Sequence, residues 1–204
     1  MNPYIKRKIL KKQDNSFGEM EDHIAIEKRL RVSVNGKEVI GLYCTPSMIR
    51  ELVVGFFLTE GILDGKFCLD DISIKDIGEE IVVDIPAKVE IGTEGLTLTS
   101  GCVGGLTLNK KRDFEKITDS FSIKAAAIET VFNEFQKMGK LYRLTGCVHS
   151  AALSDGTKML AFAEDIGRHN AVDKVIGHSI LEEIPFTQKL MLVSGRLSSE
   201  IASR

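Results

Sequence analysis

Helical and β-strand patterns alternate through the second half of the sequence, and this alternation constrains the fold more than any other feature. The expected elements are, in order, a helix from Ser122 to Met138 that ends at Gly139, a strand near Tyr142, a hairpin turn at Asp155-Gly156, a strand Met159–Ala163, a helix His169–Leu181 and a strand Leu190–Val193. Helices that alternate with strands normally pack on the faces of a sheet. Residues 116–204 are therefore expected to form a layered α/β domain.

The first half of the chain is richer in strand signals. Asn35-Gly36, the strongest short hairpin signal, separates the β-rich runs His23–Val34 and Val39–Thr45. Thr45 followed by Pro46 is typical of an N-cap and a first helical turn, so we expect a buried, mostly apolar helix Ser47–Glu60. Further short runs are interrupted by glycine and proline and predict a meander of edge or hairpin strands. These strands are expected at Ile72–Ile77, Ile81–Ile85 and Leu96–Thr99.

The chain divides into three parts on these patterns. We expect a flexible N-terminal tail over residues 1–22, a β-rich part with one helix over residues 23–115, and the α/β part over residues 116–204. Five of the first twelve residues are basic and none is acidic, which fits either a basic arm or a solvated terminus. The chain stops at Arg204 within the first turns of an expected helix, so a truncated protein is expected.

Charge and composition argue against several classes of partner and location. The net charge of -2 gives no global field that favours nucleic acid or an anionic membrane. The longest apolar stretch, Leu52–Leu58, is far shorter than the ~20 residues that span a bilayer, and the N-terminus lacks the apolar segment of a signal peptide. We therefore expect a cytoplasmic protein with reduced thiols. The four cysteines are Cys44, Cys68, Cys102 and Cys147.

One cysteine lies among glycines in the segment Thr99–Gly105, directly after an expected strand. Glycines allow a loop to turn its backbone N–H groups inward, and a thiol flanked by such donors can have a lowered pKa and an exposed thiolate. Cys102 is therefore a candidate reactive thiol. The alternative is a small hydrophobic residue in a tight turn, and the motif alone does not decide between the two.

A thiol and an imidazole lie two residues apart in the segment Thr145–Ala152. A histidine near a thiol can stabilise the thiolate or move a proton. A buried, structural thiol is the favoured interpretation of Cys147, whereas His149 is favoured as a functional residue. No Cys-x-x-Cys pair accompanies the histidine, which argues against a zinc site.

Charged and polar side chains gather in Glu164–Lys174, where an expected strand leads into a helix. The glycine of this segment permits close backbone approach, the helix N-terminus offers N–H groups, and Arg168 offers a guanidinium to phosphate. Ligand sites of α/β proteins form at such strand ends, so the segment predicts an anion site. The alternative is a strongly capped helix in which Asp165 caps and Asp173 pairs with His169.

The same order of strand, glycine turn and arginine recurs in Ser194–Glu200. Two strand ends that both carry Gly-Arg suggest a diphosphate or a nucleotide held between them. Taken alone, an ordinary serine-capped helix with Glu200 in its first turns is nearly as good an explanation.

Together and in this order, the four segments resemble the FdhD family. The chain carries a Ser-x-Cys loop, Thr-Gly-x-x-His-x-Ala-Ala, Glu-Asp-Ile-Gly-Arg-His-Asn-Ala-Val-Asp-Lys and Ser-Gly-Arg-x-Ser-x-Glu. The match is almost continuous from Glu164 to Gly177, and the resemblance runs from about His23 to the end of the chain.

The resemblance implies a homodimer with a cytidine-deaminase-like, three-layer α/β/α domain beside a smaller β-rich N-terminal part. It implies a sulfur carrier, or sulfurtransferase, that takes sulfur from a cysteine desulfurase and passes it to the bis-guanine-dinucleotide form of the molybdenum cofactor, for formate dehydrogenase. The family's persulfide cysteine corresponds to Cys102, and His149 is a candidate for proton transfer or thiolate stabilisation. The residues expected to bind the cofactor are Gly167, Arg168, His169, Ser194, Gly195, Arg196 and Ser198. No metal ligands, nucleic acid or membrane are expected.

The chain departs from the family pattern in two places. Many members have Cys-x-x-Cys where this chain has Cys102-Val103-Gly104-Gly105, which argues against a mechanism that needs both thiols. The family's strand-rich segment after Ser-Gly-Arg, which includes a stretch implicated in holding the cofactor, is absent after Arg204.

Three other functions compete with sulfur transfer as explanations of these motifs. A nucleobase deaminase needs His-x-Glu and Pro-Cys-x-x-Cys, but alanine, Ala151, stands where the glutamate must be, and the second motif is absent. A hydrolase that uses Cys102 with His149 or His169 stays open, as does a nucleotide-binding module without chemistry. Zinc content, thioester hydrolysis and cyanolysable sulfur distinguish the three.

Overall fold

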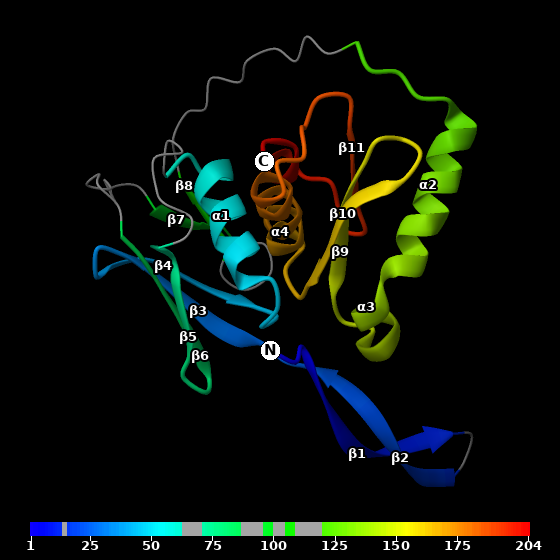
Figure 1. The fold of residues 1–204 in the computed structure, drawn as a ribbon. Helices are drawn as coiled ribbons and strands as arrows, with labels where there is room; N and C mark the ends of the chain where they lie inside the picture. The colour runs from blue at the N-terminus through cyan, green and yellow to red at the C-terminus, as the bar shows by residue number, and fades with distance from the viewer. Residues whose placement is uncertain (14–15, 63–70, 87–95, 100–104, 109–119) are drawn as a thin grey trace.

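The computed structural model of the protein describes residues 1–13, 16–62, 71–86, 96–99, 105–108 and 120–204. Within these residues the fold is mixed α/β, as expected, with five helices and eleven strands in four sheets (Figure 1). None of these helices is long and apolar enough to cross a membrane. The elements are β1 (Tyr4–Gln13), β2 (Ser16–Ala25), β3 (Lys28–Val34), β4 (Lys37–Cys44), α1 (Ile49–Thr59), β5 (Ser73–Asp76), β6 (Glu80–Ile85), β7 (Leu96–Thr99), β8 (Gly105–Leu108), α2 (Ala125–Met138), α3 (Lys140–Thr145), β9 (His149–Ser154), β10 (Met159–Asp165), α4 (Arg168–Leu181), β11 (Leu190–Val193) and α5 (Ser199–Ala202).

The larger sheet has the strand order β4-β3-β6-β5 and packs against α1. β3 and β4 form the expected hairpin, since Asn35 and Gly36 have positive φ angles of 50° and 75°. β5 and β6 form a second hairpin, but β6 also pairs in parallel with β3, a pairing that a simple meander does not contain. The alternate residues Ile81, Val83 and Ile85 of β6 are fully buried, which explains its interior position.

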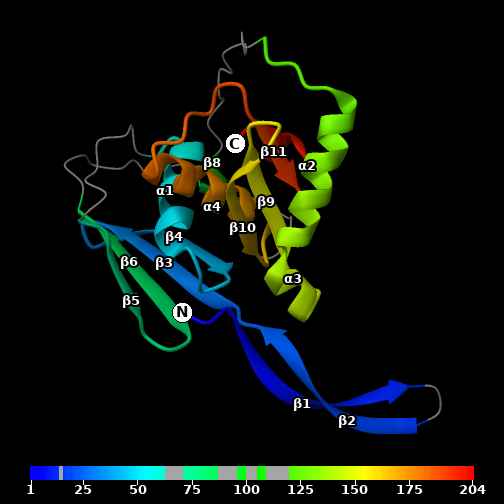
Figure 2. The same cartoon turned by 45° about the vertical axis from the view of Figure 1, so that its right-hand side comes forward.

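The three-stranded sheet, in the order β10-β9-β11, is antiparallel and lies between two helices. Successive residues of a strand point to opposite faces. Ala151 and Leu153 of β9 pack with α4, whereas Ala152 packs with Val131 and Phe135 of α2. Figure 2 shows α2 and α4 on opposite sides of β9 and β10. This arrangement agrees with the layered α/β organisation expected for the second half of the chain.

Helices α1 and α4 cross with their backbones in contact and so join the two halves of the chain. A Cβ atom on Gly55 would lie 1.8 Å from the carbonyl oxygen of Asp173, and one on Gly177 would lie 1.9 Å from that of Glu51. A side chain at either position is sterically excluded, so this crossing requires glycine on both helices. α1 is the buried, apolar helix that the sequence predicts.

Helix α1 begins two residues later than the expected Ser47, and Thr45 is not its N-cap. Its first residue is Ile49, and the N-cap is Met48, with φ 52° and ψ 46°. Thr45 is buried, and both its backbone N–H and its hydroxyl donate to the carboxylate of Asp165. The local pattern predicts that Thr45 caps helix α1, but its side chain is instead hydrogen-bonded to Asp165, which lies 120 residues further along the chain.

The strand expected near Tyr142 is instead the short helix α3. The carboxylate of Glu164, on β10, accepts hydrogen bonds from the backbone N–H groups of Leu141 at 2.9 Å and Tyr142 at 2.8 Å. Acceptors at a helix N-terminus satisfy N–H groups that have no partner within the helix. A tertiary contact therefore stabilises helical turns that the local sequence does not predict.

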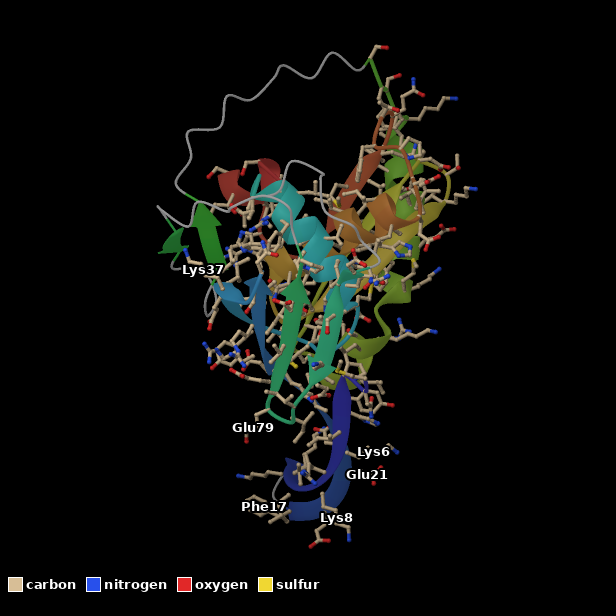
Figure 3. All side chains as sticks on the ribbon, turned by 60° about the vertical axis from the view of Figure 1, so that its left-hand side comes forward. Lys6, Lys8, Phe17, Glu21, Lys37 and Glu79 are labelled. Atoms are coloured by element: carbon tan, nitrogen blue, oxygen red, sulfur yellow. The ribbon has the colours of Figure 1, made fainter. Side chains whose placement is uncertain are left out.

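Residues 1–22, expected to be a flexible tail, form β1 and most of β2. The two strands pair over ten residues in an antiparallel ladder. Opposite charges face one another across it: Lys6 Nζ lies 3.0 Å from Glu21 Oε1, and Arg7 is directly opposite Asp22. Figure 3 labels Lys6 and Glu21 on the hairpin. Ladder hydrogen bonds and cross-strand charge pairs order a segment whose composition alone is typical of a tail.

The helix crossing predicts that Gly177→Ala strongly destabilises the protein. The new methyl group would lie 1.9 Å from a backbone oxygen, so the helices must move apart. We expect a loss of roughly 3 kcal/mol in the free energy of unfolding, measured by urea unfolding. Gly18→Ala in β2, where a Cβ atom meets nothing within 4 Å, is the matched control. Equal unfolding midpoints for the two variants would contradict the prediction.

Candidate anion-binding site

Three of the four sequence motifs meet at one end of the three-stranded sheet. β9 begins at His149, directly opposite Asp165, the last residue of β10. Ser194, which follows β11, donates its backbone N–H to the carbonyl oxygen of Ser150 at 2.9 Å. The Ser194 hydroxyl oxygen accepts the N–H of Ser150 at 2.8 Å. The sheet therefore places side by side three segments that are distant in the sequence.

The glycine turn after β11 lies against the side chains of Arg168 and His149. A Cβ atom on Gly195 would lie 3.2 Å from Arg168 Cβ and 3.3 Å from His149 Nδ1. A larger residue would push the turn away from both side chains. Arg168 is buried, His149 is half-buried and Arg196 is exposed. One guanidinium is therefore held within the protein, and the other is open to solvent.

The charges around His149 favour its neutral form. Burial and then the positive charge of Arg168 lower the pKa of His149, Arg196 adds to this more weakly, and Asp165 opposes it. Two guanidinium groups beside an imidazole with a lowered pKa mark a region of positive potential, which suits an anion such as phosphate. At neutral pH His149 is an uncharged imidazole that can accept or donate a hydrogen bond.

His169 lies between α4 and α5. Its side chain is buried, and its Nε2 lies 3.3 Å from Glu200 Oε2. Burial, followed by the charges of Arg204 and Arg168, lowers the pKa of His169 to about 4, so the ring is neutral at neutral pH in spite of the nearby carboxylate. Asp173, the alternative partner considered for His169, binds Arg204 at 2.7 Å.

The other two expected residues lie at helix starts. Gly167 is the N-cap of α4, and a Cβ atom there would lie 2.9 Å from the side-chain nitrogen of Asn170. Ser198 is the N-cap of α5, and its hydroxyl oxygen accepts the N–H of Ile201 at 3.4 Å. Both residues therefore have a structural role besides any contact with an anion.

A buried polar network holds the start of α4 in place. Asp165 Oδ2 lies 2.6 Å from Lys174 Nζ, and both side chains are fully buried. The same oxygen accepts the backbone N–H and the hydroxyl of Thr45, at 3.0 and 2.9 Å. The other oxygen, Oδ1, accepts the N–H of Gly167 at 2.8 Å. The backbone that precedes α4 is therefore fixed by groups that do not reach solvent.

Thr45 and Lys174 support the site but are not among the residues that the sequence analysis assigns to it. The partner of Thr45 lies 120 residues away, so no local pattern reveals it. Lys174 carries a charge on the buried face of α4, between Asp173 and the apolar Val175. A charged residue on such a face is a signal for a buried partner.

Two of the four cysteines lie within the described residues. Cys44 is fully buried, and burial, followed by the nearby Asp165 carboxylate, raises the pKa of its thiol to about 12, so it stays protonated. Cys147 is exposed rather than buried as expected, because it follows α3 on a surface turn. Cys102 and Cys68 lie outside the described residues. In the part of the chain that is described, no three His, Cys, Asp or Glu residues group as metal ligands.

A cavity of about 300 Å³ lies next to the glycine turn. Ser194, the residue before Gly195, lines this cavity. Its wall is largely aromatic, formed by Phe132, Phe135 and Tyr142, and Gln136 adds a side-chain amide. Aromatic walls favour flat ring systems, which can stack on them. The cavity can therefore hold a planar group. It is lined by α2, on the face of the sheet opposite α4, and shares Ser194 with the glycine turn.

The low pKa of His169 predicts a loss of stability in mild acid. The unfolded chain takes up this proton near pH 6.5 and the folded protein only near pH 4, so the free energy of unfolding should fall between these values. The expected fall is roughly 2 to 3 kcal/mol. The free energy of unfolding is measured with urea at pH 7, 6 and 5. The His169→Gln variant should lose most of the decrease that the wild type shows between pH 7 and pH 5. The control is His178→Gln on the same helix, and a parallel loss in all three proteins would rule out His169 as the cause.

Comparison with known proteins assigns a family to the chain. A family model described as the FdhD/NarQ family matches residues 25–204. The chain is 33% identical over 206 residues to the sulfur carrier protein FdhD of Bacillus licheniformis, covering 98% of this chain and 78% of that protein. It is also 33% identical over 207 residues to that of Wolinella succinogenes, covering 97% and 72%. A solved structure described as a formate dehydrogenase accessory protein from Desulfotalea psychrophila has the same fold, with a TM-score of 0.71 at 24% identity over 99% of this chain and 78% of that one. The chain belongs to the FdhD/NarQ family.

Proposed function

We propose that the protein is a sulfur carrier, or sulfurtransferase, in the maturation of formate dehydrogenase. It takes sulfur from a cysteine desulfurase and passes it to the molybdenum cofactor in its bis-guanine-dinucleotide form. The observation that carries the proposal is the meeting of Arg168, Arg196 and His149 around one glycine turn, since a pair of guanidinium groups suits the diphosphates of such a cofactor. The description of the relatives as sulfur carrier proteins supports the sulfur chemistry.

Cys102 is the proposed sulfur acceptor. Its thiolate attacks the outer sulfur of the desulfurase persulfide, a new S–S bond forms, and the desulfurase cysteine leaves as a thiolate. The outer sulfur of the Cys102 persulfide is then the atom destined for the cofactor, which is the substrate of the carrier. His149 is half-buried and neutral, and is therefore suited to take or return a proton on this sulfur.

The phosphates of the cofactor are proposed to bind at the glycine turn, and a base in the neighbouring cavity. Arg168 supplies a guanidinium of fixed position, whereas Arg196 can move to meet the ligand. Stacking on aromatic rings discriminates poorly between bases, so the cavity should accept more than one. The proposed binding residues are Gly167, Arg168, His169, Ser194, Gly195, Arg196 and Ser198.

The proposal extends to the assembly and its setting. The protein would act in the cytoplasm as a homodimer, with the desulfurase and formate dehydrogenase as partners and without nucleic acid or membrane. The helix–sheet–helix part, residues 116–204, would be a cytidine-deaminase-like domain beside a β-rich part, residues 23–115. The packing of α2 and α4 on opposite faces of one sheet supports a helix–sheet–helix domain in the second half of the chain.

The persulfide proposal predicts that Cys102→Ala does not take up sulfur. After incubation with a cysteine desulfurase and cysteine, the mass of the wild-type protein should rise by about one sulfur atom, and a reductant should reverse the change. Cys147→Ala, which removes the exposed thiol of the described residues, is the control and should keep the added sulfur. Uptake of sulfur by Cys102→Ala would show that another residue is the acceptor.

The arginine pair predicts that Arg168→Ala weakens nucleotide diphosphate binding about tenfold or more. A hydrogen bond to a charged group contributes ~1.5–3 kcal/mol, and tenfold corresponds to about 1.4 kcal/mol. Isothermal titration should give similar, salt-sensitive affinities for guanosine and adenosine diphosphates. Arg29→Ala, an exposed arginine of the larger sheet, is the control. No binding of either nucleotide to the wild type would remove these arginines from the proposed site.

A further inference from the structure

The β1–β2 hairpin presents an open strand edge. Figures 1 and 3 show the hairpin standing away from the rest of the molecule, and only its base lies near α3. Within the described residues β1 pairs with β2 alone, so one side of its ten-residue backbone has no sheet partner. The ladder has no register shift, whereas a bulge would twist such an edge away. The edge is therefore regular and long enough to accept another strand.

β1 is basic along its whole length. It has no acidic residue, and its basic residues are Lys6, Arg7, Lys8, Lys11 and Lys12. β2 carries three acidic residues, so two of the five positive charges of β1 (five minus three) are not balanced by its neighbour. Lys11 and Lys12 lie opposite Gly18 and Phe17, which carry no charge. The excess of positive charge is therefore greatest toward the tip of the hairpin.

Apolar side chains lie among these lysines. Leu10 and Phe17 are each 70% exposed, and they are diagonal neighbours on one face of the hairpin. Because side chains alternate along a strand, Lys8, Leu10 and Lys12 share that face. Figure 3 labels Lys8 and Phe17 on the part of the hairpin that stands away from the rest of the molecule. An isolated two-stranded hairpin is marginally stable in water, and a third strand beside β1 with an apolar side chain next to Leu10 would stabilise it.

We propose that β1 receives an extended acidic segment of a partner protein as a third strand. Main-chain hydrogen bonds along the open edge supply affinity. Carboxylates opposite Lys8 and Lys12, with an apolar residue between them opposite Leu10, supply selectivity. Lysine on a strand edge disfavours pairing with neutral or basic strands. Because β1 carries several lysines, an acidic strand is its favoured pairing partner. A second β1 strand would place lysine against lysine.

The hairpin is also distinct from the candidate anion-binding site. The family model begins at residue 25, so β1 and nearly all of β2 precede the region that it matches. The candidate anion-binding site lies at the end of the three-stranded sheet, and no residue of the hairpin is among those that form it. The docking proposal therefore does not rest on the proposed function.

A short peptide tests the proposal on the full chain. The probe is a fluorescein-labelled peptide of sequence Thr-Glu-Thr-Val-Thr-Glu-Thr, and anisotropy reports its binding. We expect saturable binding that Lys8→Glu/Lys12→Glu weakens about tenfold, because each reversal replaces an attraction with a repulsion. The control is Lys37→Glu/Lys75→Glu, which reverses two exposed lysines on β4 and β5, the edge strands of the larger sheet. It should leave binding unchanged.

Modified peptides separate strand addition from simple attraction between charges. Successive N–H groups of an extended peptide point to opposite edges of the strand. Two further peptides are therefore N-methylated, one on the N–H groups of one edge and the other on those of the opposite edge. Both keep the two carboxylates but lose main-chain donors. The peptide blocked on the set that faces β1 should bind about tenfold more weakly or worse, since several hydrogen bonds are lost. Equal binding of the parent and both methylated peptides overturns the proposal. No binding of the parent peptide overturns it as well.

Other occupants of the hairpin give different results. If the peptide does not bind and Leu10→Asp/Phe17→Asp converts a dimer to a monomer in sedimentation, a second copy of the chain covers this surface. If the peptide does not bind and vesicles that contain phosphatidylserine do, the surface is a lipid contact. Either outcome overturns the proposal. None of these measurements depends on sulfur uptake or nucleotide binding, so the two proposals succeed or fail separately.

Discussion

The buried ion pair between Asp165 and Lys174 is the interaction on which the rest of the structure depends. Both side chains are fully removed from solvent, and their atoms lie 2.6 Å apart. The desolvation penalty of two buried charges is offset only when each is well paired and hydrogen-bonded, and loss of one partner leaves a buried charge uncompensated. Here Asp165 also accepts two hydrogen bonds from Thr45, at the end of β4, and one from the N–H of Gly167, at the start of α4. One carboxylate therefore ties the first sheet, the second sheet and the helix of the site together.

The close packing of α1 against α4 also joins the two halves of the chain, through steric fit rather than charge. Gly55 and Gly177 bring the two backbones together, and no side chain can enter between them. Close packing of this kind allows little sliding, because interiors are filled to crystal-like density. At the other end of the crossing, Asp173 and Glu60 bind the nearly buried guanidinium of Arg204, at 2.7 and 2.9 Å. The orientation of α4, and with it that of Arg168, follows from contacts at its start and along its length.

Sequence patterns predicted most elements of this fold, and the errors share one cause. The hairpin at Asn35-Gly36, the helices of the second half and the strand ends of the anion site all have local signals, and the structure contains them. Thr45, the helix at Tyr142 and the ordered N-terminal strands depend on partners elsewhere: Asp165, Glu164 and the acidic residues of β2. Local propensity cannot indicate such partners, because tertiary contacts override it. The sequence also placed arginines at two strand ends, but only the antiparallel order β10-β9-β11 shows that those ends meet.

The charge balance of the candidate anion-binding site favours a ligand that carries negative charge. Arg168 and Arg196 bring two permanent positive charges, and neither can be neutralised at physiological pH. His149 adds no third charge, because burial and these same arginines lower its pKa. An anion bound at the turn would reduce the repulsion from the arginines and raise the pKa of His149 toward its ordinary value, so anion binding and protonation of this imidazole are linked. A neutral imidazole beside two fixed cations can therefore respond to the ligand by taking up a proton, which a third arginine at that position could not do.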